Sequence, residues 1–405
     1  MATIPSTGKI PAAMGGIPAF EQPVEVVKTA LPDFDVVTER LGRMWVTCRL
    51  SNNGYYVREL ERLISETVGV KHCIAVSNGT ISLIMILKSL GLTGRIVLPS
   101  FTFCATVHAA VWAGLEPVFA DIDPETFNIS PETVEAVMSD DVSAVMPVCV
   151  YGSPCDMDGL ESLALRYDVR LVFDSAQAIG SKYHGRQLGS FGDAESFSVH
   201  ATKMLPAGEG GLITTSNDDL ADYLRCARNF GLTEDADCDI IGTNAKMQEF
   251  SALLGIEGLY TLGQAIEYRG QLVRLYREML GKIPGIRFQI HSPDCESNHQ
   301  NMAVVIDERE FGISRNELMD ALSMENINCR KYFYPPIHRT SVYAGRSAHA
   351  ELPVTDMIAA RVLCLPIHSD MPHAVVERIC STIHQIHNNS QAVGQALGQE
   401  HRKAA

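Results

Sequence analysis

Short apolar runs alternate with stretches of helical spacing from about residue 56 to residue 265. The apolar runs are rich in Val, Ile and Leu and end in turn residues, a pattern typical of buried parallel strands. Seven segments are predicted to be strands, at 73–78, 95–100, 116–122, 143–152, 170–176, 194–199 and 210–216. Strands that alternate with helices predict an α/β fold with a doubly wound, mostly parallel sheet sandwiched by helices.

Apolar residues three and four positions apart predict helices at 79–92 and 157–168, and a much longer helical pattern covers 244–280. Beyond it the predicted elements become shorter. We therefore predict a large domain, residues 1–265, and a smaller C-terminal α+β domain, residues 266–405. The first 20 or so residues are predicted to form an extended arm and the last 15 or so to be disordered, since neither end carries a sustained apolar stripe.

The 405 residues carry a formal net charge of −15, which argues against general binding to nucleic acid or to anionic membranes. No apolar run is long enough to span a bilayer, and the first residues lack the apolar core of a signal peptide, so we expect a cytoplasmic protein. The 11 cysteines are scattered without a C-x-x-C pair. We therefore expect reduced thiols and neither a metal site nor a disulfide framework.

Chemistry is expected where the parallel strands end, because ligands of open α/β sheets lie beyond the carboxyl ends of the strands. The segment 77–80, SNGT, opens a helix with Gly79 and Thr80 and offers backbone N–H groups and a hydroxyl to an anion. A plain helix cap explains the same residues equally well. Phe101 and Phe103 follow the next strand, and either ring is suited to the core or to stacking on a flat ligand.

Asp174 ends another apolar strand, and a buried carboxylate needs a cationic or hydrogen-bonding partner. Gln177, three residues on, is placed to present its amide to the same ligand. A helix cap or a salt bridge to a nearby arginine is the alternative explanation for Asp174.

Lys203 follows a further strand and stands among small, mostly uncharged residues, with Ser198 and Thr202 nearby. Most lysines are solvated, but a lysine in a dry pocket has a lowered pKa and can attack a carbonyl. An amine, a carboxylate, an aromatic ring and an anion-binding helix start are together what pyridoxal phosphate requires. The combination predicts a pyridoxal phosphate site.

Sequence motifs in this order resemble those of the DegT/DnrJ/EryC1/StrS aminotransferases, fold-type I pyridoxal phosphate enzymes that mostly aminate keto sugars attached to nucleotides. The resemblance covers about residues 40 to 385 and includes SNGTISL (77–83), LPSFTFCAT (98–106), FDSAQAIGSKYHG (173–185), SFSVHATKMLPAGEGG (196–211) and YFYPPIH (332–338). It implies that eight residues bind the cofactor: Gly79, Thr80, Phe103, Asp174, Gln177, Ser198, Lys203 and Asn244.

The resemblance also implies roles for these residues. Lys203 corresponds to the lysine that forms a Schiff base with the cofactor, and Asp174 to the partner of the ring nitrogen. Asn244 corresponds to an asparagine that reaches the cofactor phosphate of a second subunit, which implies a homodimer. Tyr332, Tyr334 and His338 lie in the segment that approaches the sugar, where the match is looser.

The function implied is transfer of an amino group, from L-glutamate by family habit, to a keto sugar with ping-pong kinetics. A related branch that deoxygenates sugars has histidine in place of Lys203, which favours transamination here. The sequence assigns no role to His200 or Glu209. The alternatives are an aminotransferase for a cyclitol or another non-nucleotide ketone, a pyridoxal phosphate dehydratase, and a non-catalytic regulator that retained the fold.

Overall fold

The computed structural model describes residues 10–233, 235, 237–292, 294–345 and 351–404. A seven-stranded sheet with the order β1-β9-β8-β5-β4-β2-β3 forms the centre of the larger part of the molecule. Its strands are β1 (His72–Val76), β2 (Arg95–Pro99), β3 (Glu116–Ala120), β4 (Val142–Val145), β5 (Arg170–Asp174), β8 (Ala194–Ser198) and β9 (Gly211–Thr215). All pairs are parallel except those made by β9, which confirms the predicted mostly parallel sheet.

Helices cover both faces of this sheet, and the alternation of side chains along each strand decides which face each residue joins. One core holds Ala75, Phe173 and Phe197 together with α2, α6 and the first half of α8. The other holds Val76 and Val172 together with α3, α4 and α7. These helices are α2 (Tyr55–Val68), α3 (Gly79–Ser89), α4 (Cys104–Ala113), α6 (Met157–Tyr167), α7 (Asp218–Ala227) and α8 (Glu249–Leu280). A short helix, α5 (Pro131–Glu135), precedes β4.

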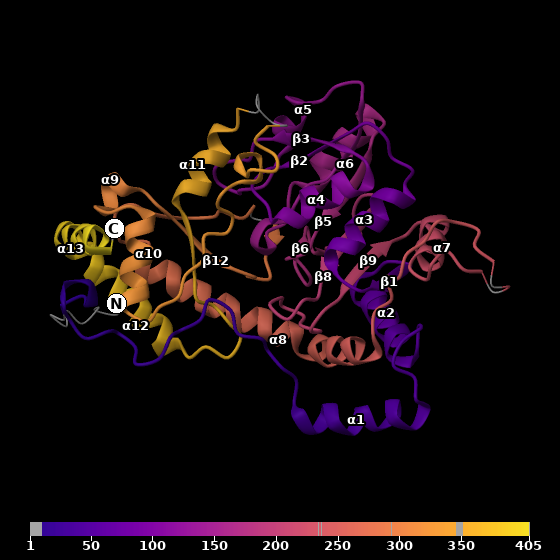
Figure 1. Cartoon of the computed structure of the whole chain (residues 1–405), viewed down its shortest axis with the longest axis horizontal. Helices are drawn as coiled ribbons and strands as arrows, with labels where there is room; N and C mark the ends of the chain where they lie inside the picture. The colour runs from indigo at the N-terminus through magenta and orange to yellow at the C-terminus, as the bar shows by residue number, and fades with distance from the viewer. Residues whose placement is uncertain (1–9, 234, 236, 293, 346–350, 405) are drawn as a thin grey trace.

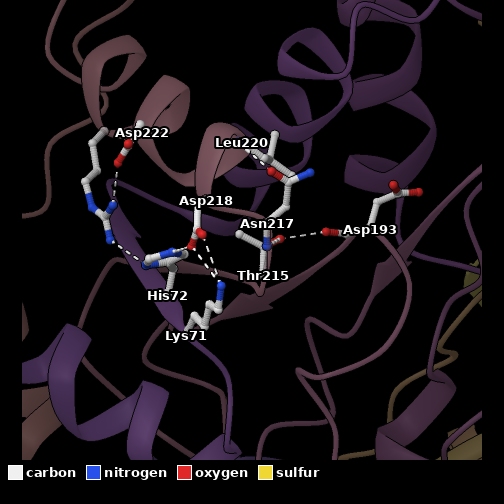
Figure 2. Close-up of polar contacts among 9 residues, drawn as sticks. Lys71, His72, Asp193, Thr215, Asn217, Asp218, Leu220 and Asp222 are labelled. Carbon is white, nitrogen blue, oxygen red and sulfur yellow. Dashed lines mark hydrogen bonds and ion pairs between the residues drawn. The ribbon is translucent and has the colours of Figure 1, made fainter.

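Polar contacts hold the β1 edge of the sheet to the start of α7 (Figure 2). Lys71 and His72 both contact the carboxylate of Asp218, at 3.0 and 2.7 Å. Asn217 caps the helix by accepting the N–H of Leu220, and its own N–H bonds the hydroxyl of Thr215. This cluster therefore joins the edge strand β1 to α7, at the end of the sheet opposite the predicted site.

A second sheet, with the order β10-β12-β13, organises the C-terminal part of the chain. Its antiparallel strands are β10 (Ile286–Phe288), β12 (Met302–Ile306) and β13 (Val362–Leu365). The helices of this part are α9 (Glu308–Phe311), α10 (Arg315–Met324), α11 (Pro353–Arg361), α12 (His373–Asn388) and α13 (Ser390–Ala404). Two-residue strands form a third, small sheet: β6 (Lys182–Tyr183), β7 (Arg186–Gln187) and β11 (Cys295–Glu296).

The long helix α8 connects the two main parts of the molecule (Figure 1). Leu253 and Ile256 in its first half belong to a core of the large sheet, whereas Leu272 and Tyr276 in its second half belong to the core of the C-terminal part. Residue 265 lies inside this helix, so the division of the chain at that position stays a prediction.

The two ends of the chain pack against the C-terminal part. Ala12 and Ala19 each donate a backbone N–H to the buried carboxylate of Glu325 at 2.7 Å, so the described part of the expected arm is docked. Residues 1–9 lie outside the described chain. Among the described residues, the short 3-10 helices are η1 (Ala12–Met14), η2 (Val150–Gly152) and η3 (Ile337–Arg339).

The expectation of a disordered C-terminus is corrected by α13, which is helical over Ser390–Ala404. Val393 and Leu397, four residues apart, are buried in the core of the C-terminal part. Two apolar positions on one helix face are a weak sequence signal for a helix. The packing of α10 and η1 against this helix supplies the stabilisation that the sequence pattern does not reveal. No helix among the described residues combines the length and apolar character needed to cross a membrane.

The helix α1 (Phe34–Thr47) lies below α2 and α8 and packs on the large core through Val37 and Met44 (Figure 1). Three of its other apolar side chains are largely exposed: Phe34 at 79%, Trp45 at 74% and Val46 at 87%. A hollow of about 920 Å³ is lined by this helix, the start of α2 and Glu249. The helix therefore has an apolar face that this chain alone does not cover.

Candidate active site

A cavity of about 680 Å³ lies at the carboxyl ends of the parallel strands. Of the eleven residues expected at the site, eight line it: Gly79, Thr80, Phe103, Asp174, Gln177, Ser198, Lys203 and Tyr332. Parallel strands point their carboxyl ends to one edge of the sheet, and this is why Gly79 and Lys203, 124 positions apart in the sequence, meet here. Tyr332 comes to the cavity from the C-terminal part. The sequence prediction of the location is thus supported by geometry.

The start of α3 forms one end of the cavity. Asn78 caps the helix, with its side chain accepting the N–H of Ile81 at 2.9 Å. The N–H groups of Gly79 and Thr80 have no hydrogen-bond partner within the described chain. A Cβ on Gly79 would lie 3.0 Å from the Cβ of Ser198 and 3.4 Å from its hydroxyl. Glycine therefore allows the helix start and the Ser198 hydroxyl to form one small cradle for an anion.

Asp174 lies in the floor of the cavity and is almost fully buried. Its carboxylate accepts the Thr106 hydroxyl at 2.7 Å and the Ala176 N–H at 3.1 Å. Burial raises the pKa of Asp174, while these two hydrogen bonds and the charge of Lys203 oppose the shift. No cationic nitrogen of the described residues lies within ion-pair distance of this carboxylate. The site is therefore suited to a ligand that brings its own positive charge.

Lys203 lies on the loop between β8 and β9 and lines the same cavity. Its backbone N–H bonds the carbonyl of His200 at 2.9 Å, within a turn. Burial lowers the pKa of the Lys203 amine, and the Asp174 carboxylate opposes that shift. A larger fraction of the amine is therefore neutral and nucleophilic than for a lysine in water.

Gln177 and Phe103 complete the surroundings of these two groups. The side-chain oxygen of Gln177 accepts the N–H of Tyr151 at 2.8 Å, which leaves the amide nitrogen as the donor on the cavity side. That nitrogen also contacts the side-chain oxygen of Asn301 at 3.5 Å. Phe103 caps α4 with its ring 59% exposed at the cavity rim. A flat ring with a hydrogen-bond acceptor can contact both residues.

Three expected residues do not line this cavity. His338 is buried, with its Nδ1 2.7 Å from the hydroxyl of Ser100 and its Nε2 3.2 Å from the carboxylate of Asp356. Tyr334 is half exposed and packs under the guanidinium of Arg315. The substrate-binding role that the resemblance gives to His338 and Tyr334 stays a prediction.

Asn244 also lies away from the cavity of its own chain, in a bridge between its backbone and that of Asn229. This position is compatible with the implied contact to another subunit, which a single chain does not test. The role of Asn244 stays a prediction.

Several cavity residues were not found from the sequence. Thr106 belongs to the motif LPSFTFCAT (98–106), but its bond to Asp174 depends on the first turn of α4 packing beside β5. Gln300 and Asn301 come from the C-terminal part and follow no local motif. His200 and Glu209 both line the cavity mouth, 3.7 Å apart between Nε2 and Oε1. Of these residues, only Thr106 had a sequence signal for a place in the site, and it was weak: the residue stands four positions after Thr102 at the start of a helix.

Comparison with known proteins places the chain in a family. The model of the DegT/DnrJ/EryC1/StrS aminotransferase family matches residues 36–384. The chain belongs to this family. It is therefore an aminotransferase, as the lysine, the aspartate and the order of the motifs predicted. The expectation that it has the same fold as these enzymes is also confirmed.

Individual relatives cover nearly the whole chain. A dTDP-4-amino-4,6-dideoxy-D-glucose transaminase from Shigella dysenteriae is 34% identical over 91% of this chain and all of the relative. A GDP-perosamine synthase from Caulobacter vibrioides is 30% identical over 87% of this chain and 94% of the relative. The crystal structure of DesI in the presence of its TDP-sugar product has a TM-score of 0.90 and 39% identity, covering 96% of this chain and 98% of DesI.

Proposed function

We propose that this aminotransferase binds pyridoxal phosphate in the 680 Å³ cavity and aminates the ketone of a nucleotide-linked sugar. The observation that carries the proposal is that Lys203 and Asp174 line the same cavity and interact electrostatically, with an anion cradle at the start of α3. Asp174 fits a cationic ring nitrogen, since it is buried without an ion pair in the described chain. The cradle of Gly79, Thr80 and Ser198 fits the phosphate.

When bound, the cofactor supplies a carbonyl carbon that bonds amines and a ring that accepts an electron pair. Asp174 would hold the cofactor by pairing with the charge of a protonated ring nitrogen. Gln177 would hold it by donating its amide N–H to an oxygen of the ring. Lys203 would hold it through its amine, and when free that amine would remove the proton from the α-carbon of the amino donor. In the second half of the reaction the same amine would return a proton to the sugar carbon that becomes aminated.

We infer that the acceptor is a dTDP-linked 4-keto-6-deoxyhexose. The names of two relatives, from Shigella dysenteriae and Escherichia coli, place an amine at carbon 4 of a dTDP-linked 4,6-dideoxyglucose, and the DesI structure contains a TDP-sugar product. A transaminase forms such a product from the ketone at the same carbon. Tyr332 and Phe333 line the cavity, and their rings support this inference because they offer apolar surface to a sugar.

The test is direct. Protein loaded with pyridoxal phosphate and treated with borohydride should retain the cofactor on Lys203 in the mass spectrum of its peptides. With L-glutamate and the dTDP-linked ketone, nuclear magnetic resonance should show a nitrogen-bearing carbon 4. Attachment of the cofactor without amination of any nucleotide-linked ketone would refute the substrate, and absence of attachment would refute the site.

We also propose that two chains form a homodimer in which Asn244 completes the partner's cavity. The exposed apolar face of α1 and the 98% exposed Ile241, three residues from Asn244, support this assembly. Light scattering should show a dimer that Trp45→Glu dissociates, because the charge would be buried in the interface. Mixing inactive Lys203→Ala chains with Asn244→Ala chains should restore activity, since one site of each mixed dimer is intact. No recovery after confirmed subunit exchange would place Asn244 outside the partner's site.

A further inference from the structure

The segment 298–301, with the sequence NHQN, lies between the C-terminal part and the cavity and leads directly into β12. Asn298 fixes its start, donating to the carbonyls of Gln177 at 2.8 Å and Ile179 at 2.9 Å. The side-chain oxygen of Asn298 accepts the N–H of Gln300 at 3.0 Å. The backbone at Gln300 is therefore held in place beside the cavity.

The side chain of Gln300 contacts the Lys203 loop on both sides of the lysine. Its oxygen accepts the N–H of Met204 at 3.0 Å, and its nitrogen donates to the carbonyl of Thr202 at 3.0 Å. The residue is 3% exposed. A single buried amide thus pairs with two peptide groups that flank Lys203, as a neighbouring strand would.

Arg269 on α8 holds Gln300 from behind. Its guanidinium donates to the carbonyl of Gln300 at 3.2 Å and to the hydroxyl of Ser369 at 3.2 Å. The side chain is 2% exposed, and burial lowers the pKa of Arg269 to about 10. A buried charge is costly, so its hydrogen bonds to backbone and hydroxyl groups are the compensation the structure provides. These bonds fix the backbone from which the Gln300 amide extends.

We infer that Gln300 is a positioning residue that sets the orientation of Lys203 by holding the peptide groups on either side of it. The inference rests on the proposed function of Lys203 as the amine that bonds the cofactor and moves protons. The loop from β8 to β9 has no regular secondary structure, and its own bonds hold the N–H groups of Ala201 and Lys203, whereas Gln300 holds the Thr202 carbonyl and the Met204 N–H. Proton transfer is sensitive to such placement, because a shift of about 1 Å can cost about 10²-fold in rate.

Gln300→Met tests the inference, because it keeps the length of the side chain and removes both hydrogen bonds. Gln289→Met is the matched control. Gln289 is 5% exposed and also makes two side-chain bonds to backbone, to the carbonyls of Thr126 and Val150, but it does not line the cavity. Both variants lose two buried hydrogen bonds, so a purely structural role predicts the same behaviour for both.

Two measurements separate the variants. In cofactor-free protein, hydrogen exchange of the Met204 amide should become about 10-fold faster in Gln300→Met and stay unchanged in Gln289→Met. In protein given pyridoxal phosphate, the rate of bond formation at Lys203 and kcat should fall about 10- to 100-fold in Gln300→Met, with KM for the keto sugar changed less than about threefold. Equal values for the two variants in both measurements would overturn the inference.

Gln300→Glu provides a second variant of the same shape in case Gln300→Met does not fold. An ionised carboxylate keeps the bond from Met204 but faces the Thr202 carbonyl without a proton to donate, whereas a protonated carboxyl restores both bonds. The activity of this variant relative to wild type should therefore rise as pH is lowered. A ratio independent of pH would overturn the inference. If wild type itself forms no bond between Lys203 and the cofactor, the proposed function fails instead.

Discussion

Two buried carboxylates lie on neighbouring parallel strands, and their surroundings differ. Asp174 ends β5, and Glu195 is the second residue of β8, where it pairs with Phe173. Burial raises the pKa of both groups, that of Glu195 to about 7. Glu195 is enclosed by donors of its own chain: the Ser175 hydroxyl at 2.6 Å and the N–H groups of Gly189 at 2.5 Å and Phe191 at 3.0 Å.

Asp174 receives two donors and lines the 680 Å³ cavity, whereas Glu195 receives three donors and does not line it. The difference shows that a perturbed pKa does not by itself mark a functional carboxylate. An enclosed carboxylate organises the loop that binds it. One that borders a cavity is available to a ligand. Substitutions on the cavity side should therefore affect activity, and those on the enclosed side should affect stability.

The largest effect is expected for Lys203→Ala, which removes the amine from the cavity wall. The value of kcat/KM should fall by about 10⁴-fold or more, because the variant loses both the cofactor bond and the base. The melting temperature of the cofactor-free protein should change by less than about 3 °C. Lys182→Ala, which removes a surface ion pair to Glu296, is the control and should keep full activity. Comparable losses of kcat/KM in the two variants would contradict the proposal that activity depends on the residues of the cavity.

Asp174→Asn should lower kcat/KM by about 10²- to 10³-fold, because a neutral amide cannot hold a proton on the ring nitrogen. Asparagine has the shape of aspartate, and its side-chain oxygen can still accept the Ala176 N–H. Glu195→Gln is the matched variant on the enclosed side and should change kcat/KM by less than about threefold. Steady-state kinetics on the same substrate gives kcat/KM for the two variants. A larger loss of kcat/KM in Glu195→Gln than in Asp174→Asn would contradict the proposed difference between the two carboxylates.

Gly79→Ala should weaken cofactor binding by about 10-fold, since its Cβ would meet the Cβ of Ser198 at 3.0 Å and widen the anion cradle. Equilibrium dialysis or fluorescence titration with pyridoxal phosphate measures the change. Gly263→Ala on α8 has open space around its Cβ and should leave the affinity unchanged. Unchanged affinity in Gly79→Ala would show that the cradle does not bind the phosphate.

Glu195→Gln should have the smallest effect on activity and a measurable effect on the stability of the fold. Its pKa is raised in the folded protein from 4.5 to about 7, so the folded state binds the proton more tightly. The resulting stabilisation, about 3 kcal/mol, is complete below pH 4.5 and is lost as pH rises through 7. Urea unfolding between pH 4 and pH 8 should show this loss in wild type and not in Glu195→Gln. Parallel pH curves for the two proteins would contradict the assignment.

The sequence predicted the strands and the site residues that immediately follow them. Every predicted segment of the large sheet overlaps a strand, although in the segment 143–152 the strand ends at Val145 and η2 follows from Val150. Lys203, Asp174 and Gly79 could be predicted because each lies at the end of a buried strand or soon after it, and the sheet itself brings such positions together. The family could be predicted for the same reason, as its motifs are short and contiguous.

The parallel core and the position of the cavity were predictable from the sequence, because strand periodicity and local motifs depend on neighbours in the chain. The predicted lysine and carboxylate line that cavity, and their roles stay predictions. The fold was needed to show that Thr106 bonds Asp174, that Gln300 holds the Lys203 loop and that Glu195 is enclosed. It also decided the helical state of α13 through Val393 and Leu397. The bonds made by Thr106 and Gln300 join residues 68 and 96 positions apart in the chain, and their strength comes from burial and hydrogen bonding that no local pattern encodes.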